Sequence, residues 1–366
     1  MSVDSIPVAV APASRRLARR PARVALVLLM AAVLVACAPR NAFQFSSPNP
    51  EARVERVYVA TARDLGDLGP SFGDERVEGL RYLHMDVSIP PTHQLGEIEW
   101  PKGTPDAATD FVVTDSHVYR GSNSMVRAMR QHSSGKETLV FVHGYNNTFS
   151  DAVYRFAQIR ADFDFTGPGV LYSWPSAGDP RGYAYDRDSV LYSRDDFQQV
   201  LESLTAAPGE RVLLLAHSMG AQLVMETLRQ AALRGDRRVL DRISGVVLMA
   251  PDIDPDLFRR QAAAIGKLPQ PFVIFVSRKD RVLSLSGLLF GRKPRLGVIN
   301  GPEQLEGVEG VQVLDFTALG AENSGKGLGH AVPMTSPAAI RVLRGMIDEP
   351  RRETDGFGNF LKLRFD

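Results

Sequence analysis

The stretch VLLLAHSMG at residues 212–220 decides which fold this 366-residue chain adopts. Its first five residues are apolar and an apolar repeat at helical spacing follows it, so the stretch predicts a buried strand that turns sharply into a helix. Such a turn requires small neighbours, here Gly220 and Ala216, which stands where the G-x-S-x-G pattern has glycine. The turn exposes Ser218 at the carboxyl end of the strand, and we predict it as a nucleophile. The backbone N–H of Met219 is then a candidate donor to an oxyanion.

Apolar runs and helical patterns alternate on both sides of this stretch. Such alternation predicts a mostly parallel sheet with helices on both faces. The first runs are joined by connections too short for a helix, so the N-terminal strands are expected to be antiparallel. The predicted fold class is therefore α/β, with the site beyond the carboxyl ends of the strands. The expected strands are residues 57–60, 82–89, 98–100, 138–142, 170–172, 212–216, 246–249, 272–276 and 311–316.

A second motif, FVHGYN at residues 141–146, lies at the end of the predicted strand 138–142. A His-Gly pair at this point, upstream of the nucleophile, is where α/β-hydrolases place their other oxyanion donor. We assign that role to the backbone N–H of Tyr145. Asn146 is expected to orient the loop and is a candidate substrate-binding residue. We interpret His143 as a buried structural histidine.

The general base follows from chain order, because this fold places its triad in the order serine, acid, histidine. Of the seven histidines only His330 lies beyond Ser218, so it is the predicted base. Asp280 follows the penultimate predicted strand, where a carboxylate can accept the second imidazole N–H. Asp252 and Asp254, which follow the strand before that, are the alternatives. We interpret these two as helix-capping residues.

Five motifs then occur together: YVATAR at 58–63, FVHGYN at 141–146, SWPS at 173–176, the YD pair at 185–186 and AHSMG at 216–220. With them the chain resembles, from about residue 55 to residue 350, the bacterial α/β-hydrolases of the DUF900 family, an esterase- and lipase-like group. The resemblance implies the hydrolase fold and a serine-hydrolase site, but no substrate. Trp174, Tyr185 and Asp186 then either line a substrate pocket or pack and brace the loops.

The first 36 residues are expected to be a lipoprotein signal peptide. Arginines precede a short apolar run, residues 24–36, which is shorter than the roughly 20 residues that span a bilayer. The run ends in LVAC, which resembles a lipobox, and Cys37 is the only cysteine of the chain. The alternative is an ordinary cleaved signal. We predict lipid anchoring at Cys37, an anchor and tether over residues 37–52, the hydrolase domain over 53–350 and a C-terminal tail over 351–366. Since alanine follows the cysteine, the outer membrane, facing the periplasm, is favoured.

Composition narrows the function further. The formal net charge of +1 gives no reason to expect nucleic acid as a partner, and no pattern indicates a metal or an organic cofactor. We expect hydrolysis of a small-molecule or lipid-like carboxylic ester at the cell envelope. A thioesterase or transacylase, or a non-enzymatic binding module on the same fold, are the alternatives. The apolar segment 282–290 is either a lid over the site or part of the core.

Overall fold

The computed structural model describes residues 43–65, 72–132, 137–290, 293–318 and 330–348. The chain divides into two compact units, residues 1–40 and 41–366, and the second holds all the described residues. The predicted signal peptide, Cys37 and the C-terminal tail lie outside the described residues. Within the described part, the helices are too short or too polar to cross a membrane.

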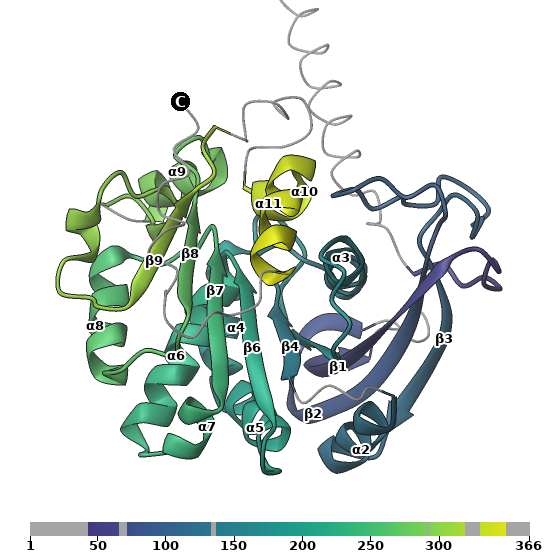
Figure 1. Cartoon of the computed structure of the whole chain (residues 1–366), viewed down its shortest axis with the longest axis horizontal. Coiled ribbons are helices and arrows are strands. Elements are labelled where there is room, and N and C mark those ends of the chain that lie inside the picture. The colour runs from purple at the N-terminus through teal and green to yellow at the C-terminus, as the bar shows by residue number, and fades with distance from the viewer. Residues whose placement is uncertain (1–42, 66–71, 133–136, 291–292, 319–329, 349–366) are drawn as a thin grey trace, which may run out of the picture. The chain divides into compact units, whose positions relative to one another are not determined.

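A nine-stranded sheet forms the centre of the second unit, with the order β3-β2-β1-β5-β4-β6-β7-β8-β9 (Figure 1). The strands β1, β2 and β3 pair antiparallel, and every later pairing is parallel. The predicted fold class is therefore confirmed. The strand bounds are β1 Arg53–Leu65, β2 Phe72–Ile89, β3 Val112–Tyr119, β4 Glu137–Val142, β5 Gly169–Ser173, β6 Arg211–His217, β7 Ile243–Met249, β8 Phe272–Val276 and β9 Val311–Asp315.

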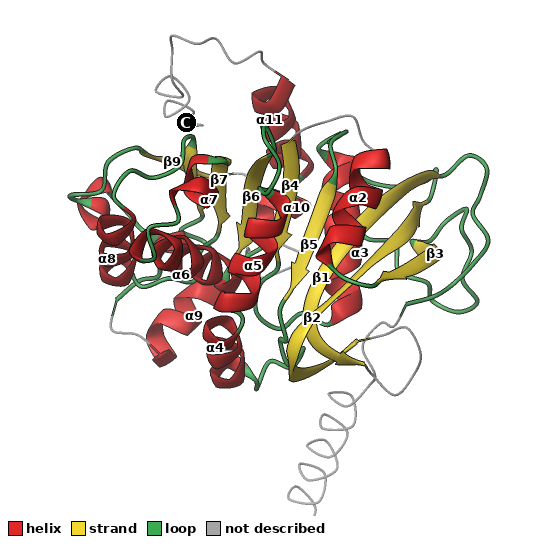
Figure 2. Cartoon of the chain, turned by 90° about the horizontal axis from the view of Figure 1, so that it is seen from below, coloured by secondary structure: helices red, strands yellow, loops and turns green. Residues whose placement is uncertain are grey.

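Helices cover both faces of the sheet (Figures 1 and 2). In the central strand β4, Val140 and Val142 join the core cluster that includes α5, α6 and α8, whereas Leu139 and Phe141 join the cluster that includes α3 and α11. Because both faces are buried, the strand is apolar throughout. The helix bounds are α2 Ser122–His132, α3 Phe149–Asp162, α4 Tyr183–Tyr192, α5 Arg194–Leu204, α6 Met219–Leu233, α7 Arg237–Asp241, α8 Pro255–Ile265, α9 Arg281–Phe290, α10 Val332–Thr335 and α11 Pro337–Asp348, with 3₁₀ turns η1 Leu296–Val298 and η2 Pro302–Leu305.

One predicted strand is wrong. Residues 98–100 lie in a loop, where the partly buried side chains of Ile98 and Trp100 pack against the core. The ring of Trp100 lies 4.8 Å from that of Tyr154. Strand β3, which forms the sheet edge instead, was not predicted because its sequence, VVTDSHVY, lacks an apolar alternation and leaves Val118 exposed.

The folded part also begins earlier than residue 53. The N–H of Val113 donates to the Gln44 carbonyl at 2.9 Å, and Phe45 forms a bridge to the same residue. The ring of Phe43 packs 5.6 Å from that of Phe149. Residues 43–45 therefore pack against the sheet and its helix α3.

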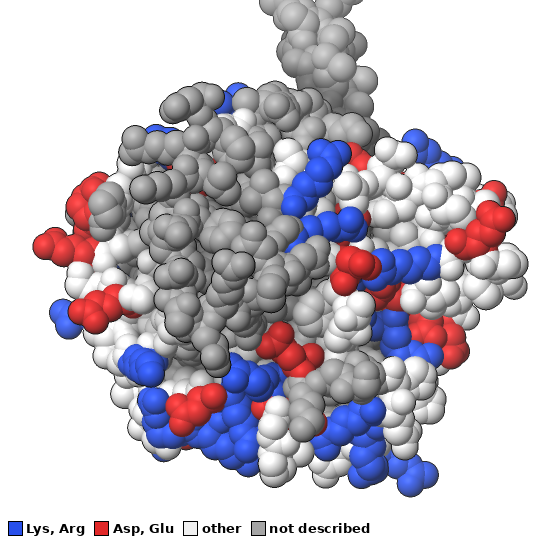
Figure 3. Space-filling model, viewed as in Figure 1, with Lys and Arg blue, Asp and Glu red and all other residues white. Residues whose placement is uncertain are grey.

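Charged side chains of both signs are interspersed over the face that Figure 3 shows. This mixture agrees with the formal net charge of +1.

Candidate active site

The turn between β6 and α6 holds Ser218 in a strained backbone conformation, with φ 53° and ψ −120°. A non-glycine residue held in such a region costs on the order of 1–3 kcal/mol, which the surroundings must offset. Two backbone hydrogen bonds do so, from the Ser218 N–H to the Met249 carbonyl (2.9 Å) and from the Asp252 N–H to the Ser218 carbonyl (3.1 Å). The predicted strand–turn–helix elbow is present, but Ser218 is only 2% exposed, so the exposure predicted for its side chain is wrong.

Two glycines allow the loop after β4 to pack directly on this elbow. A Cβ atom on Gly220 would overlap the carbonyl oxygen of His143 and lie 2.6 Å from that of Val142. A Cβ atom on Gly144 would lie 2.9 Å from the Cβ of Ser218. The FVHGYN loop and the nucleophile turn are therefore in van der Waals contact at their backbones, and this contact explains why small residues flank the serine.

His330 pairs with Asp280. The distance from Nδ1 of His330 to Oδ2 of Asp280 is 2.6 Å, and the carboxylate is fully buried. Its other oxygen accepts the N–H of Leu283 at 3.0 Å, which fixes the carboxylate at the start of α9. This is the geometry in which a carboxylate orients an imidazole and stabilises its charged form.

The His330 residue lies beside the elbow. Its ring centroid is 4.6 Å from that of His217, and Nε2 of His217 lies 3.2 Å from the His330 carbonyl oxygen. Burial, and then the neighbouring His330, hold the pKa of His217 well below its usual value, so His217 is neutral and Nε2–H donates to that carbonyl. Among the described residues, no hydrogen bond joins Ser218 Oγ to His330; such catalytic contacts often tighten only around a substrate.

The two alternative acids are engaged elsewhere. The carboxylate of Asp252 accepts the hydroxyl of Tyr183 at 2.9 Å and lies 3.1 Å from Nε of Arg295. Burial, and then Asp252, raise the pKa of Tyr183 to about 12, so this hydroxyl remains a donor. The Asp254 side chain accepts from the first N–H groups of α8 and caps that helix, as interpreted from the sequence. The structure therefore pairs the imidazole of His330 with Asp280 and with neither alternative.

The peptide before Tyr145 is held in one orientation. Its carbonyl oxygen, that of Gly144, lies 2.8 Å from Nδ1 of His143 and accepts Nδ2 of Asn147 at 3.2 Å. In a trans peptide the N–H points opposite to the carbonyl, so the N–H of Tyr145 points away from both side chains. Asn146 follows with φ 61°, and its own N–H donates to Asp186 at 3.1 Å. Asn146 thus holds the loop through its backbone, which agrees with the orienting role expected for it.

Met219 is the first residue of α6 and is buried. The first N–H groups of a helix have no partner within the helix, and the helix dipole favours negative charge there. Its N–H is therefore placed to serve a developing oxyanion beside Ser218.

A buried arginine, Arg63, holds the loops that surround the FVHGYN motif. It is 1% exposed, and its guanidinium donates to the Ser173 hydroxyl (3.0 Å) and to the carbonyl oxygens of Ser176 (3.1 Å) and Asn147 (2.9 Å). Burial lowers the pKa of Arg63 to about 10, so it remains charged at neutral pH. In the sequence, Arg63 is marked only by its place in the YVATAR motif, as a lone arginine at the end of an apolar strand.

Asp186 completes this network from α4. Its carboxylate is fully buried and accepts the Ser176 hydroxyl at 2.6 Å and the Ala177 N–H at 2.7 Å, besides the Asn146 N–H. Burial raises the pKa of Asp186, and the three donors oppose that shift. Asp186 therefore braces two loops, which is the second of the two roles considered for it.

Trp174 has a bracing position, not a pocket-lining one. It is fully buried, its ring stacks 4.8 Å from that of His143, and its Nε1–H donates to the His143 carbonyl at 2.8 Å. A side chain without exposed surface cannot line an open pocket, so the tentative substrate-binding role of Trp174 is corrected. Burial lowers the pKa of His143 to about 3, and this neutral, enclosed imidazole has the structural role that we expected.

Tyr185 contacts residues near the start of β2. Its hydroxyl donates to the Asp74 carbonyl at 2.7 Å, and the guanidinium of Arg76 lies 4.2 Å from the centre of its ring.

In the segment 282–290, considered either as a lid or as core, the start of α9 belongs to the core, because Leu283 packs with Ala250 and Val298. The side chains of Leu285 and of residues 288–290 lie outside the described part.

Comparison with known proteins agrees with this architecture. The profile of a family described as "Alpha/beta hydrolase of unknown function (DUF900)" matches residues 121–346. An uncharacterized protein of Nostoc sp. is 23% identical over 202 residues, which are 47% of this chain and 50% of that protein. The chain therefore spans about half the length of the curated relative that it matches.

Solved structures overlap it more loosely. Dienelactone hydrolase from Anabaena variabilis has a TM-score of 0.34 at 12% identity, covering 75% of this chain and 94% of its own. Brefeldin A esterase, a bacterial homologue of human hormone-sensitive lipase, has a TM-score of 0.34 at 15% identity, with 93% and 88% covered. The monoacylglycerol lipase of Paleococcus ferrophilus has a TM-score of 0.32 at 16% identity, with 57% and 94% covered. TM-scores this low add no argument to the family match.

Proposed function

Because the chain belongs to the DUF900 family of α/β-hydrolases, we propose that it is a serine hydrolase that cleaves a carboxylic ester with Ser218, His330 and Asp280. The observation that carries the proposal is the 2.6 Å pair of His330 and a fully buried Asp280, next to the strained elbow of Ser218. A general base needs a carboxylate that orients its imidazole through Nδ1, and Asp280 supplies one at the carboxyl end of the sheet, where this fold has its site.

In the proposed reaction the Ser218 hydroxyl attacks the ester carbonyl while His330 takes its proton. Asp280 stabilises the imidazolium that forms. The oxyanion of the tetrahedral intermediate accepts the N–H groups of Met219 and Tyr145, each worth about 3 kcal/mol of barrier. His330 then protonates the leaving alcohol, and a water molecule, activated by the same imidazole, releases the acid from the acyl-serine.

Hydrolysis of p-nitrophenyl esters, from acetate to palmitate, tests this activity. The full chain in detergent should turn over at least one ester of the series, and Ser218→Ala and His330→Ala should each reduce kcat by at least about 10³-fold. Ser203→Ala, a serine-to-alanine change on the distant α5, is the matched control and should retain full activity. Turnover that survives Ser218→Ala would contradict the assignment of the nucleophile.

The alternative acyl chemistries use the same residues and differ only in the acceptor and leaving group. A thioesterase would prefer acyl thioesters over the oxygen esters of the same chain length, and a transacylase would form a new ester when an alcohol is added. A binding module would keep its fold and ligand affinity in Ser218→Ala, with no turnover in the wild type.

We further propose that the protein is a lipoprotein of the cell envelope, anchored through Cys37, in the outer membrane and facing the periplasm. Such an anchor holds an enzyme beside lipid-like acyl esters, because each buried CH₂ group of the acyl chains contributes about 0.8 kcal/mol. Metabolic labelling with an alkyne fatty acid, followed by membrane fractionation, tests this location. The wild type should carry label in the outer-membrane fraction, and Cys37→Ser should carry none; equal labelling of both would contradict the anchor.

A further inference from the structure

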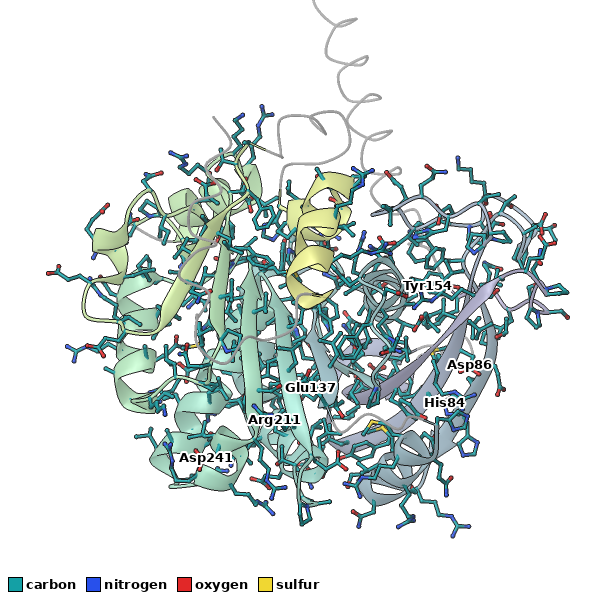
Figure 4. The ribbon with its side chains drawn as sticks, in the orientation of Figure 1. His84, Asp86, Glu137, Tyr154, Arg211 and Asp241 are labelled. Atoms are coloured by element: carbon teal, nitrogen blue, oxygen red, sulfur yellow. The ribbon has the colours of Figure 1, made fainter. Side chains whose placement is uncertain are left out.

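A second polar cluster lies on the antiparallel side of the sheet, away from β6–β8. In the register of β2 and β3, His84 faces His117 and Asp86 faces Asp115. Since side chains on one face of a strand recur at every second residue, all four lie on the same face of this strand pair. Figure 4 labels His84 and Asp86 there, on the side of the sheet opposite β8 and β9.

Three of these side chains converge. One donor atom from each of His84, Asp86 and Asp115 lies within 4.8 Å of the others. Two ligand atoms of a tetrahedral Zn²⁺ site lie about 3.4 Å apart, because each bond is about 2.1 Å long. Asp115 is exposed, so a small side-chain rotation brings the set to binding distance and leaves a path for entry from solvent.

His84 has a buried nitrogen without a partner. The residue is 6% exposed, and its Nε2 has no hydrogen-bond partner among the described residues. Its Nδ1 lies 2.7 Å from the Tyr119 hydroxyl. Tyr119 pairs with Tyr82, which precedes His84 by two residues on β2, whereas Asp86 follows His84 by two residues. Because Nδ1 is engaged with Tyr119, Nε2 is the ring nitrogen that remains for a ligand beside Asp86 and Asp115. A buried nitrogen without a hydrogen-bond partner is unfavourable, so an unpaired Nε2 calls for a ligand.

From this geometry we propose that His84, Asp86 and Asp115 form a binding site for a divalent transition-metal cation such as Zn²⁺. Imidazole nitrogen with carboxylate oxygens is a donor set that these cations accept. In the proposed site, His84 carries its proton on Nδ1 and donates it to the Tyr119 hydroxyl, so that the Nε2 lone pair binds the metal. A further imidazole, His117, lies across the strand pair, with its ring 5.7 Å from that of His84.

The neighbouring Arg56 is compatible with such a site. Its Nε and Nη2 donate to the two oxygens of Asp86 at 2.7 and 2.6 Å. An ionised carboxylate has about four acceptor positions, so two remain for a metal. The two carboxylates and the guanidinium together carry a formal charge of −1, which favours a cation. Arg56 also fixes the Asp86 carboxylate in place before the metal arrives.

Titration of the full chain with Co²⁺ and Zn²⁺ tests the site. Co²⁺ should give a visible absorption that saturates at one equivalent and that Zn²⁺ displaces. Asp115→Asn and His84→Gln should each weaken Zn²⁺ binding at least tenfold, whereas Asp188→Asn, an exposed carboxylate on α4, should bind as the wild type does. Zn²⁺ should raise the Tm of the wild type and of Asp188→Asn, and it should do so less for Asp115→Asn.

Asp115 is exposed, so its variant keeps the test valid if His84→Gln does not fold. Wild type that binds no Zn²⁺, or Asp115→Asn that binds it with unchanged affinity, overturns the proposal. The site does not depend on the proposed esterase: Asp115→Asn should hydrolyse esters at the wild-type rate, and a failure of either assignment leaves the other standing.

Discussion

The two halves of the sheet bring polar residues together in different ways. On the parallel side, Ser218, Asp280 and the FVHGYN loop each follow directly after an apolar strand, and the fold gathers strand ends at one edge. On the antiparallel side, His84 and Asp115 meet only because β2 and β3 pair in one particular register. Arg63 connects the two halves, because its side chain extends from β1 and donates a hydrogen bond to the loop after β4. Local sequence motifs therefore predict the first kind of site, whereas the second kind can be identified only from the structure.

The largest effect is expected from Asp280→Asn, which tests the parallel side. The amide keeps the shape but does not stabilise the imidazolium of His330, so kcat should fall about 10³–10⁴-fold with little change in KM. Ester hydrolysis at saturating substrate measures it. Asp254→Asn is the matched control and should retain kcat, with a loss of stability well under about 1 kcal/mol because asparagine also caps a helix N-terminus. Equal losses of kcat in the two variants would contradict the pairing.

Arg63→Met tests whether the antiparallel side supports the active site. It leaves a hydroxyl and several loop carbonyl oxygens without their donor, at about 1–3 kcal/mol for each one that stays buried. We expect the free energy of unfolding to fall by more than about 3 kcal/mol and kcat to fall as the Tyr145 peptide loosens. Urea unfolding compares it with Arg187→Met, an exposed arginine on α4. If the two variants are equally stable, Arg63 does not hold these loops.

His93 predicts a pH dependence of stability. Burial alone would lower the pKa of this imidazole, but hydrogen bonds to Asp162 and Glu99 outweigh it and raise the pKa to about 9. The folded state therefore holds a proton that the unfolded state loses above a pKa of about 6.5. The stabilisation is complete below about pH 6.5. As the pH rises from there to about 9, the free energy of unfolding falls by about 2–3 kcal/mol.

Urea unfolding between pH 6 and 9.5 measures that loss. In His93→Gln the free energy of unfolding should be lower at pH 6 and should decline less with rising pH. A wild-type curve that is flat over this range would show that the two carboxylates do not hold the imidazolium.

The smallest effect is expected from Tyr185→Phe, which removes one hydrogen bond to the Asp74 carbonyl at the protein surface. The loss of stability should be under about 1 kcal/mol, because water replaces the partner, and ester hydrolysis should not change. Measuring KM over the ester series settles the two roles left open for this residue. A tenfold rise in KM would place Tyr185 against the substrate.

The fold class, the elbow and the candidate triad could be predicted because each carries a local signal. Ser218 has its small neighbours, Asp280 follows an apolar strand, and His330 is the only histidine after the nucleophile. What could not be predicted depends on distant pairings. The edge strand β3 has no apolar alternation, the burial of Trp174 depends on its stacking with His143, and the contacts of Arg63 extend more than a hundred residues along the chain.

The central claim is that Ser218 is a nucleophile activated by its surroundings. Reaction of the full chain with a fluorophosphonate, followed by mass spectrometry of its peptides, locates any activated serine. We predict a single adduct on Ser218, present in the wild type and in Ser203→Ala and absent from His330→Ala. A folded wild type without an adduct, or an adduct on another serine, would contradict the account.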